Sequence, residues 1–175
     1  MTEQNIIVKY VPNFVTLLSL SSGFTSISFS LNKEWEIAIY LILLATVFDF
    51  FDGWFARKLK SGSNFGAELD SLSDFVSFGV APSVLIYLWS TNSLGSLGWG
   101  ATLFFVICSS LRLARFTADI YITNKPIDDN EYFVGIPSPA AAGLILLPLF
   151  IFFEFNIEFI KNEYLNLFST IFVGF

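Results

Sequence analysis

The chain has 175 residues, of which 54% are hydrophobic and 14% are charged, and its mean hydropathy is +0.67. This composition excludes an ordinary soluble domain and is typical of a polytopic membrane protein. The net charge of −6 argues against nucleic acid as a partner, and the absence of histidine removes the usual general base and the usual zinc ligand.

Six apolar segments follow one another along the chain, and a spanning helix needs about 20 mostly apolar residues. The segments are Val11–Leu31, Glu36–Phe55, Leu69–Trp89, Trp99–Phe116, Pro137–Phe155 and Ile157–Phe175. The last has charged residues at its start, so we expect it to be short or tilted, or to continue beyond residue 175. Residues Met1–Tyr10 are expected to form a short interfacial segment. The sequence therefore predicts an all-α integral membrane protein, a bundle of six transmembrane helices that forms a single domain over residues 1–175.

The basic residues predict the orientation of the bundle. With a cytoplasmic N-terminus, two of the nine Lys and Arg residues, Lys33 and Lys161, lie on the far face. The other seven lie on the cytoplasmic face: Lys9, Arg57, Lys58, Lys60, Arg112, Arg115 and Lys125. This bias agrees with the positive-inside rule and predicts a multi-pass protein with its N-terminus in the cytoplasm.

The connection between the second and third segments carries the most informative pattern, D-x2-D-G-x2-A-R-x8-G-x3-D-x3-D. Asp49 and Asp52 are three residues apart, and Asp70 and Asp74 are four apart, so each pair shares one face of a helix. Two facing helices would gather four carboxylates at the cytoplasmic end, where ionised acids near a bilayer are costly without a partner. Oxygen-only ligands favour Mg²⁺, Mn²⁺ or Ca²⁺, and a pair of such ions suits displacement at phosphorus.

Small residues and one cation accompany these acids. Gly53, Ala56 and Gly66 remove side-chain bulk where a nucleotide would approach the helices, and Arg57 reaches phosphate oxygens at the mouth of the site. The alternative is that the acids are helix-end charges paired with Arg57 and the lysines that follow it. The whole pattern, with two acid pairs in phase, favours the metal site.

This pattern resembles the signature of the CDP-alcohol phosphotransferase family at every fixed position. The resemblance implies a six-helix membrane enzyme, usually a homodimer, that transfers a phosphatidyl or phosphoalcohol group from a CDP-linked donor to an alcohol and releases CMP. It implies that Asp74 is the base that deprotonates the acceptor hydroxyl. It further implies metal binding by Asp49, Asp52, Asp70 and Asp74, and a CDP pocket lined by Asp52, Gly53, Ala56, Arg57 and Gly66.

Four other stretches look like the phosphatidylserine synthase branch of that family: VPNFVTLLSLSSGFTSIS, DSLSDFVSFGVAPSVLIY, RLARF and YFVGIPSPAAAG. Phe75 follows the last aspartate, where the phosphatidylglycerophosphate synthase branch typically has Lys. Leu20 departs from the pattern, because relatives usually have Asn there. The resemblance covers most of residues 11–150 and implies CDP-diacylglycerol as donor, L-serine as acceptor and membrane lipid as surroundings.

A serine carboxylate is best bound by Arg, and Arg112 and Arg115 lie three residues apart on the predicted fourth helix. We expect at least one of them to bind the serine carboxylate and the other to bind phosphate; the alternative is that both are snorkelling topogenic residues. Asn13 and Thr16 are either capping groups of the first helix or contacts to the donor head group.

Two rival functions remain at this stage. The first is the same chemistry on glycerol phosphate or inositol phosphate. The second is a divalent-cation carrier, since acids within a membrane often mark ion paths. The acids cluster at one predicted membrane face with no second cluster in the far half, which disfavours a carrier.

Overall fold

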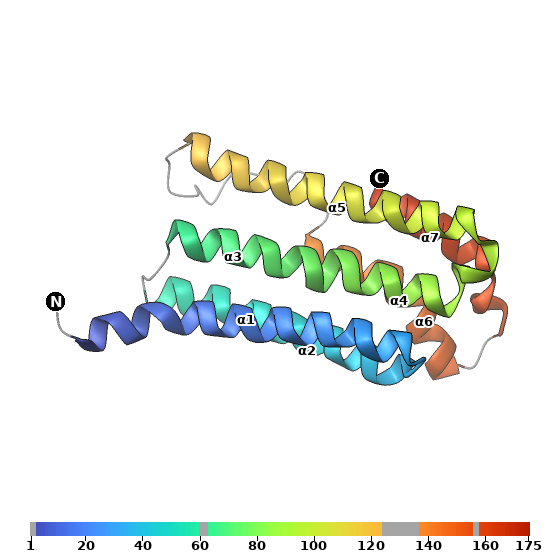
Figure 1. Cartoon of the computed structure of the whole chain (residues 1–175), viewed down its shortest axis with the longest axis horizontal. Helices are drawn as coiled ribbons and strands as arrows, with labels where there is room; N and C mark the ends of the chain where they lie inside the picture. The colour runs from blue at the N-terminus through green and yellow to red at the C-terminus, as the bar shows by residue number, and fades with distance from the viewer. Residues whose placement is uncertain (1–2, 60–62, 124–136, 156–157) are drawn as a thin grey trace.

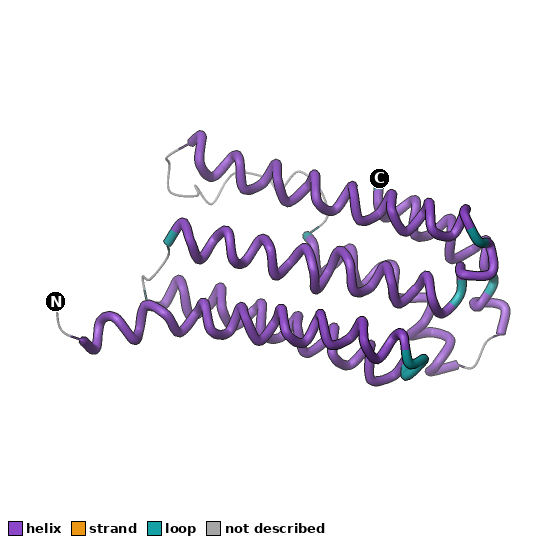
Figure 2. Tube along the Cα trace, in the orientation of Figure 1, coloured by secondary structure: helices purple, strands orange, loops and turns teal. Residues whose placement is uncertain are grey.

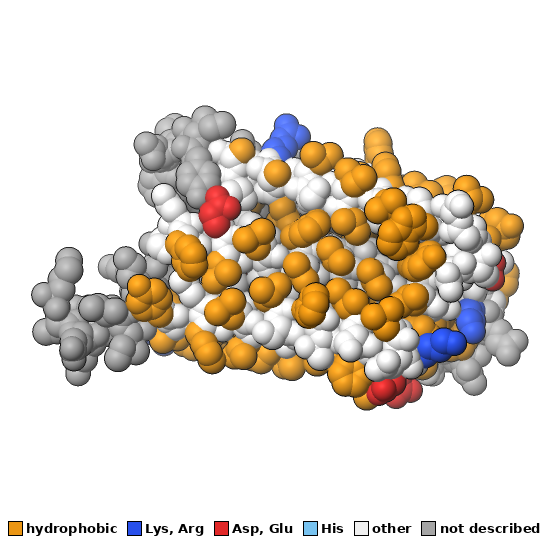
Figure 3. Space-filling view, viewed as in Figure 1, with side chains coloured by type: hydrophobic (Ala, Val, Ile, Leu, Met, Phe, Trp, Pro, Cys, Tyr) orange, Lys and Arg blue, Asp and Glu red, His pale blue; other side chains and the backbone are white. Residues whose placement is uncertain are grey.

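The computed structural model describes residues 3–59, 63–123, 137–155 and 158–175, and within these ranges the chain is helical with no strand (Figures 1 and 2). Five helices are long and apolar enough to cross a membrane. They correspond to the first five predicted segments, which are therefore confirmed. Apolar side chains are spread over the whole visible face of the bundle, and the charged ones lie near its edges (Figure 3), as expected for a protein surrounded by lipid.

The first two long helices form a tight antiparallel pair (Figure 1). They are α1 (Glu3–Leu31) and α2 (Trp35–Lys58), joined by a turn in which Lys33 has a φ of 64°. The helix α1 begins well before the membrane-spanning part at Tyr10–Leu31, so residues 3–10 extend the first helix rather than forming a separate element. The interfacial placement of this N-terminal segment remains a prediction.

The third span combines three consecutive elements: α3 (Asn64–Asp74), the π-helix η1 (Phe75–Val80) and α4 (Ala81–Trp89). It begins at Asn64, earlier than predicted, because the Ser63 hydroxyl accepts a hydrogen bond from the Gly66 amide at 3.0 Å and caps the helix. The π-helix precedes Pro82, which cannot donate to the preceding turn and crowds its carbonyls, and a wider turn relieves that conflict.

The remaining elements close the bundle on the other side. A 3₁₀ turn, η2 (Thr91–Leu94), leads into α5 (Ser96–Thr123); α6 (Ser138–Phe155), η3 (Glu158–Lys161) and α7 (Glu163–Gly174) follow. The helix α7 has 12 residues, so it is about 18 Å long, shorter than the hydrocarbon core of about 30 Å. Its start is set by the Asn162 side chain, which accepts a hydrogen bond from the Tyr164 amide. Six full spans are thus not found among the described residues.

The main apolar core and the aspartates lie toward opposite ends of the bundle. The apolar core lies toward the η2 end and joins residues of α2, α4, α5, α6 and α7, among them Ile42, Leu85, Phe105 and Leu149. The aspartates lie toward the opposite end, near the start of α3, whereas buried hydroxyl groups occur along the whole bundle, among them Thr16, Ser26 and Ser90. The cluster of acids is therefore the feature that distinguishes this end of the interior.

Candidate functional site

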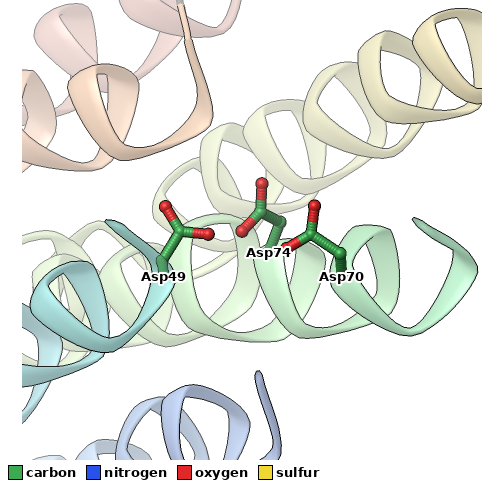
Figure 4. A group of neighbouring side chains, drawn as sticks. All are labelled: Asp49, Asp70 and Asp74. Carbon is green, nitrogen blue, oxygen red and sulfur yellow. The ribbon is translucent and has the colours of Figure 1, made fainter. Parts of the chain in front are cut away.

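Three of the predicted aspartates meet where the end of α2 passes α3. Asp49 lies on α2, and Asp70 and Asp74 lie one turn apart on α3, with their carboxylates pointing toward one another (Figure 4). One oxygen from each carboxylate lies within 4.8 Å of the others. The four-residue spacing places Asp70 and Asp74 on one face, and packing through α1 brings Asp49 to that face.

The three carboxylates are chemically suited to a hard divalent cation. Asp74 Oδ1 is buried and has no hydrogen-bond partner in the part of the chain that the structure describes. A buried acceptor without a donor is costly, and adjacent carboxylates repel each other in a medium of low dielectric constant. A bound cation removes both costs, and a set of oxygen-only donors is what Mg²⁺, Mn²⁺ and Ca²⁺ prefer.

The fourth aspartate, Asp52, is placed differently. It is 5% exposed, lies one turn beyond Asp49 on α2, and is not a member of the group of three. Its carboxylate lies against the Thr16 side chain of α1, while its Oδ2 has no hydrogen-bond partner among the described residues. Asp52 is therefore a second buried acceptor beside the cluster, facing the α1 side of the site.

The small residues of the pattern allow close contacts around the acids. A Cβ atom added at Gly53 would lie 3.9 Å from Nη1 of Arg57, so this guanidinium folds back over Gly53. A Cβ atom added at Gly66 would lie 3.1 Å from Oδ1 of Asn13, so the glycine lets α1 and α3 approach closely. Ala56 is half-buried on the same helix as Arg57. Asn13 and Thr16 of α1 thus lie beside residues of the predicted site.

The helix with the two predicted substrate arginines is joined to α3 at the same end. The Ser71 and Thr117 hydroxyl oxygens are 3.1 Å apart, which links α3 to α5 between the two aspartates of α3. Arg112 is half-buried and Arg115 is exposed, although the sequence treats them alike. The two arginine side chains therefore differ in their exposure to the surroundings of the bundle.

The described basic residues are divided between the two ends of the bundle. Arg57 and Lys58 end α2 beside the aspartates, whereas Lys33 and Lys161 lie in connections at the opposite end. The predicted positions Lys60 and Lys125, and residues 132–136 of the stretch YFVGIPSPAAAG, lie outside the described residues, as does the side chain of Lys9. The direction of the bundle across the membrane stays a prediction.

A hollow of about 850 Å³ lies at the opposite end, between α4, η2, η3 and the start of α7. None of the predicted site residues lines it. It is bounded by Trp89, Ser90, Phe152 and Tyr164, among others, and offers no cluster of acids. The hollow is therefore separate from the cluster of acids, which lies at the other end of the bundle.

Sequence reasoning missed several hydroxyl groups that connect the helices around the site. Ser71 with Thr117, and Ser19, Ser73 and Ser77, bridge different helices in the structure. Their only signal in the sequence is that serine recurs at helical spacing within apolar segments.

Comparison with known proteins agrees with this arrangement. The family model for CDP-alcohol phosphatidyltransferase matches residues 9–173. A CDP-diacylglycerol–serine O-phosphatidyltransferase of Mycobacterium leprae is 42% identical over 146 residues, which cover 81% of this chain and 48% of the relative. A protein of the same name from Helicobacter pylori is 35% identical over 168 residues, covering 93% of this chain and 69% of the relative.

An archaetidylserine synthase of Methanothermobacter thermautotrophicus is 38% identical over 143 residues, covering 77% of this chain and 55% of that protein. The chain spans about half the length of the first curated relatives it matches. The matched region of 9–173 includes all four aspartates and every helix that surrounds them. The chain belongs to the CDP-alcohol phosphatidyltransferase family.

Proposed function

We propose that this chain transfers the phosphatidyl group of CDP-diacylglycerol to L-serine, giving phosphatidylserine and CMP. The observation that carries the proposal is the meeting of Asp49, Asp70 and Asp74 within 4.8 Å at one end of an apolar bundle. The choice of serine is supported by the relatives described above, whose names specify a serine substrate or product.

The reaction forms a bond between the serine hydroxyl oxygen and the phosphorus of the phosphatidyl group, and breaks the bond from that phosphorus to the CMP oxygen. Asp74 accepts the proton of the serine hydroxyl, and CMP leaves with the bonding electrons. The buried, unpartnered Oδ1 of Asp74 is suited to that proton transfer because no protein donor competes for it among the described residues.

Divalent cations, Mg²⁺ or Mn²⁺ and most simply two of them, with Ca²⁺ as a further candidate, would be held by Asp49, Asp52, Asp70 and Asp74. When bound, they supply stabilisation of the negative charge that develops on the phosphates and on CMP. The oxygen-only donor set and the orphaned oxygens of Asp52 and Asp74 support this choice.

The nucleotide end of the donor is assigned to the side of the site that α1, α2 and α3 share. Gly53 and Ala56 carry little side-chain bulk there, Gly66 lets α1 and α3 approach closely, and the Arg57 guanidinium above Gly53 is suited to a phosphate oxygen. Asn13 faces Gly66, and Thr16 faces Asp52, so both polar side chains border the same space. We assign them to the CDP head group.

The bundle is proposed to place this site and its N-terminus on the cytoplasmic side, where free serine and CDP-diacylglycerol are both available. The two basic residues that end α2 beside the acids support this orientation. We also propose that the protein is a homodimer, as the resemblance described in the sequence analysis implies.

Replacing Arg112 by Lys is expected to raise the KM for serine about tenfold, because a bidentate hydrogen bond to the carboxylate is lost. Arg112 is half-buried, which gives such a contact more weight than at the exposed Arg115. R115K is the matched comparison and is expected to change the serine KM less. Equal serine KM values in wild type and both variants would contradict the assignment.

The acceptor is tested by competition in proteoliposomes that contain CDP-diacylglycerol. We expect CMP release and labelled phosphatidylserine with L-serine, and no product with glycerol phosphate or inositol phosphate. Product with either phosphate but not with serine would overturn the acceptor. Ion flux without CMP release, measured in the same vesicles, would instead identify a cation carrier.

A further inference from the structure

The helix α1 contacts both helices that carry the aspartates. One face of α1 buries small residues at helical spacing, the glycine Gly23 and four residues with hydroxyl groups: Thr16, Ser19, Ser26 and Ser30. α2 packs along this helix, and α3, η1 and α4 pack against it as well. The separation of Asp49 from Asp70 and Asp74 is therefore set largely through α1.

Ser19 joins three helices at a single residue. Its hydroxyl donates a hydrogen bond to the Ala45 carbonyl of α2 at 3.0 Å. Its own carbonyl accepts a hydrogen bond from the Ser77 hydroxyl of η1 at 3.2 Å. Ser19 is 1% exposed and Ser77 is 0% exposed, so water does not compete for either bond.

A third bond ties the residue next to Asp74 to α1. The Ser73 hydroxyl donates to the Thr16 carbonyl at 3.2 Å, and Thr16 also lies against Asp52. These bonds flank the acids on both helices, since Ala45 lies one turn before Asp49 on α2. Each serine hydroxyl bonds to a single carbonyl, and sliding one helix along the other would break that bond. The three bonds therefore specify the positions of α2 and α3 along the axis of α1.

Close backbone contact strengthens this constraint. A Cβ atom at Gly23 would overlap the Ser77 side chain and its Cα atom, so α1 and η1 touch without an intervening side chain. The π-helical turn begins directly after Asp74 and carries Ser77. Ser77 therefore connects the irregular turn that follows the aspartates to the backbone of α1.

We propose that Ser19, Ser73 and Ser77 form a hydroxyl clamp that holds α2 and α3 against α1 in the register that brings Asp49 to Asp70 and Asp74. They are positioning residues, because none of the three is one of the acids. Each acts by bonding α1 to a helix that carries an acid or to the turn that continues it. The inference rests on the metal site of the proposed function, and it goes beyond it by assigning what sets the geometry of that site.

The test uses the full chain in lipid nanodiscs and measures Mn²⁺ binding from the electron paramagnetic resonance signal of free Mn²⁺. We expect S19A and S77A each to bind Mn²⁺ about threefold to tenfold more weakly than wild type, a change that matches the loss of one hydroxyl–carbonyl bond inside a membrane protein. S73A is a third variant that tests the clamp if S77A yields too little folded protein.

The matched control is S26A. The Ser26 hydroxyl donates to the Ala38 carbonyl of α2 at 2.9 Å and is equally buried, but this bond lies at the apolar end of the pair, far from the acids. S26A is expected to lower the thermal stability as much as S19A does and to leave Mn²⁺ binding unchanged. If the clamp serines only stabilised the fold, S19A, S73A and S77A would change the Mn²⁺ affinity no more than S26A does.

Wild-type Mn²⁺ affinity in S19A, S73A and S77A would overturn the clamp, whatever their stability. The proposed reaction has a separate outcome. A wild-type protein that binds Mn²⁺ but forms no phosphatidylserine would overturn the transferase assignment. The effect of the clamp would still be measured, as the Mn²⁺ affinity of the serine variants. A loss of Mn²⁺ affinity confined to the clamp variants, with S26A unaffected, supports the inference.

Discussion

Asp74→Asn is expected to lower the rate of CMP release at least about a thousandfold while CDP-diacylglycerol still binds. Asn has almost the same shape as Asp, so the packing at the start of the π-helix is retained. Its amide cannot accept the proton of the serine hydroxyl, and the reaction loses its base. The buried Oδ1 of Asp74, which has no partner among the described residues, is the atom whose function is removed.

The measurement is single-turnover CMP release in nanodiscs, with donor binding followed by displacement of labelled CDP-diacylglycerol. Glu163→Gln is a suitable control, because this half-buried carboxylate lies at the start of α7, at the end of the bundle opposite the aspartates. Turnover in D74N within a few fold of wild type would refute Asp74 as the base. Loss of donor binding together with turnover would instead assign Asp74 to binding alone.

Removal of divalent cations is expected to abolish the reaction, and Asp70→Asn is expected to weaken Mn²⁺ binding by at least about a hundredfold. Asp70 is one of the three acids whose oxygens lie within 4.8 Å, so the substitution removes a charge and an oxygen donor from the group. The carboxylates repel one another without a cation, so their close approach is favourable only when a cation is bound between them.

The experiment treats the protein with EDTA, exchanges the buffer, and restores Mg²⁺, Mn²⁺ or Ca²⁺ one at a time. Glu36→Gln is the matched control, because Glu36 lies on the same helix as Asp49 but in its first turn, at the opposite end. We expect E36Q to need the same cation concentration as wild type and D70N to need far more. Full activity after chelation would contradict a metal-dependent site.

Much of the fold was predictable because its signals are local. A spanning helix needs a long apolar run. Hydropathy alone therefore located the first five spans, and most of the predicted ends lie within a few residues of the observed ones. Helical periodicity likewise predicted that Asp70 and Asp74 share a face, because that depends only on their spacing. The sixth predicted helix was less predictable, since charged residues and the Asn162 cap shorten it to α7.

The sequence by itself therefore determined the membrane class, the family pattern and the four acids with their small neighbours. Only the tertiary structure decided that Asp49 joins Asp70 and Asp74 while Asp52 turns toward Thr16, and that Arg112 is more enclosed than Arg115. It also decided that the hydroxyls of Ser19, Ser73 and Ser77 bond α2, α3 and η1 to α1. The physical reason is that spacing along a helix specifies which side chains share a face, whereas contacts such as Ser77 to Ser19, 58 residues apart, depend on how whole helices pack.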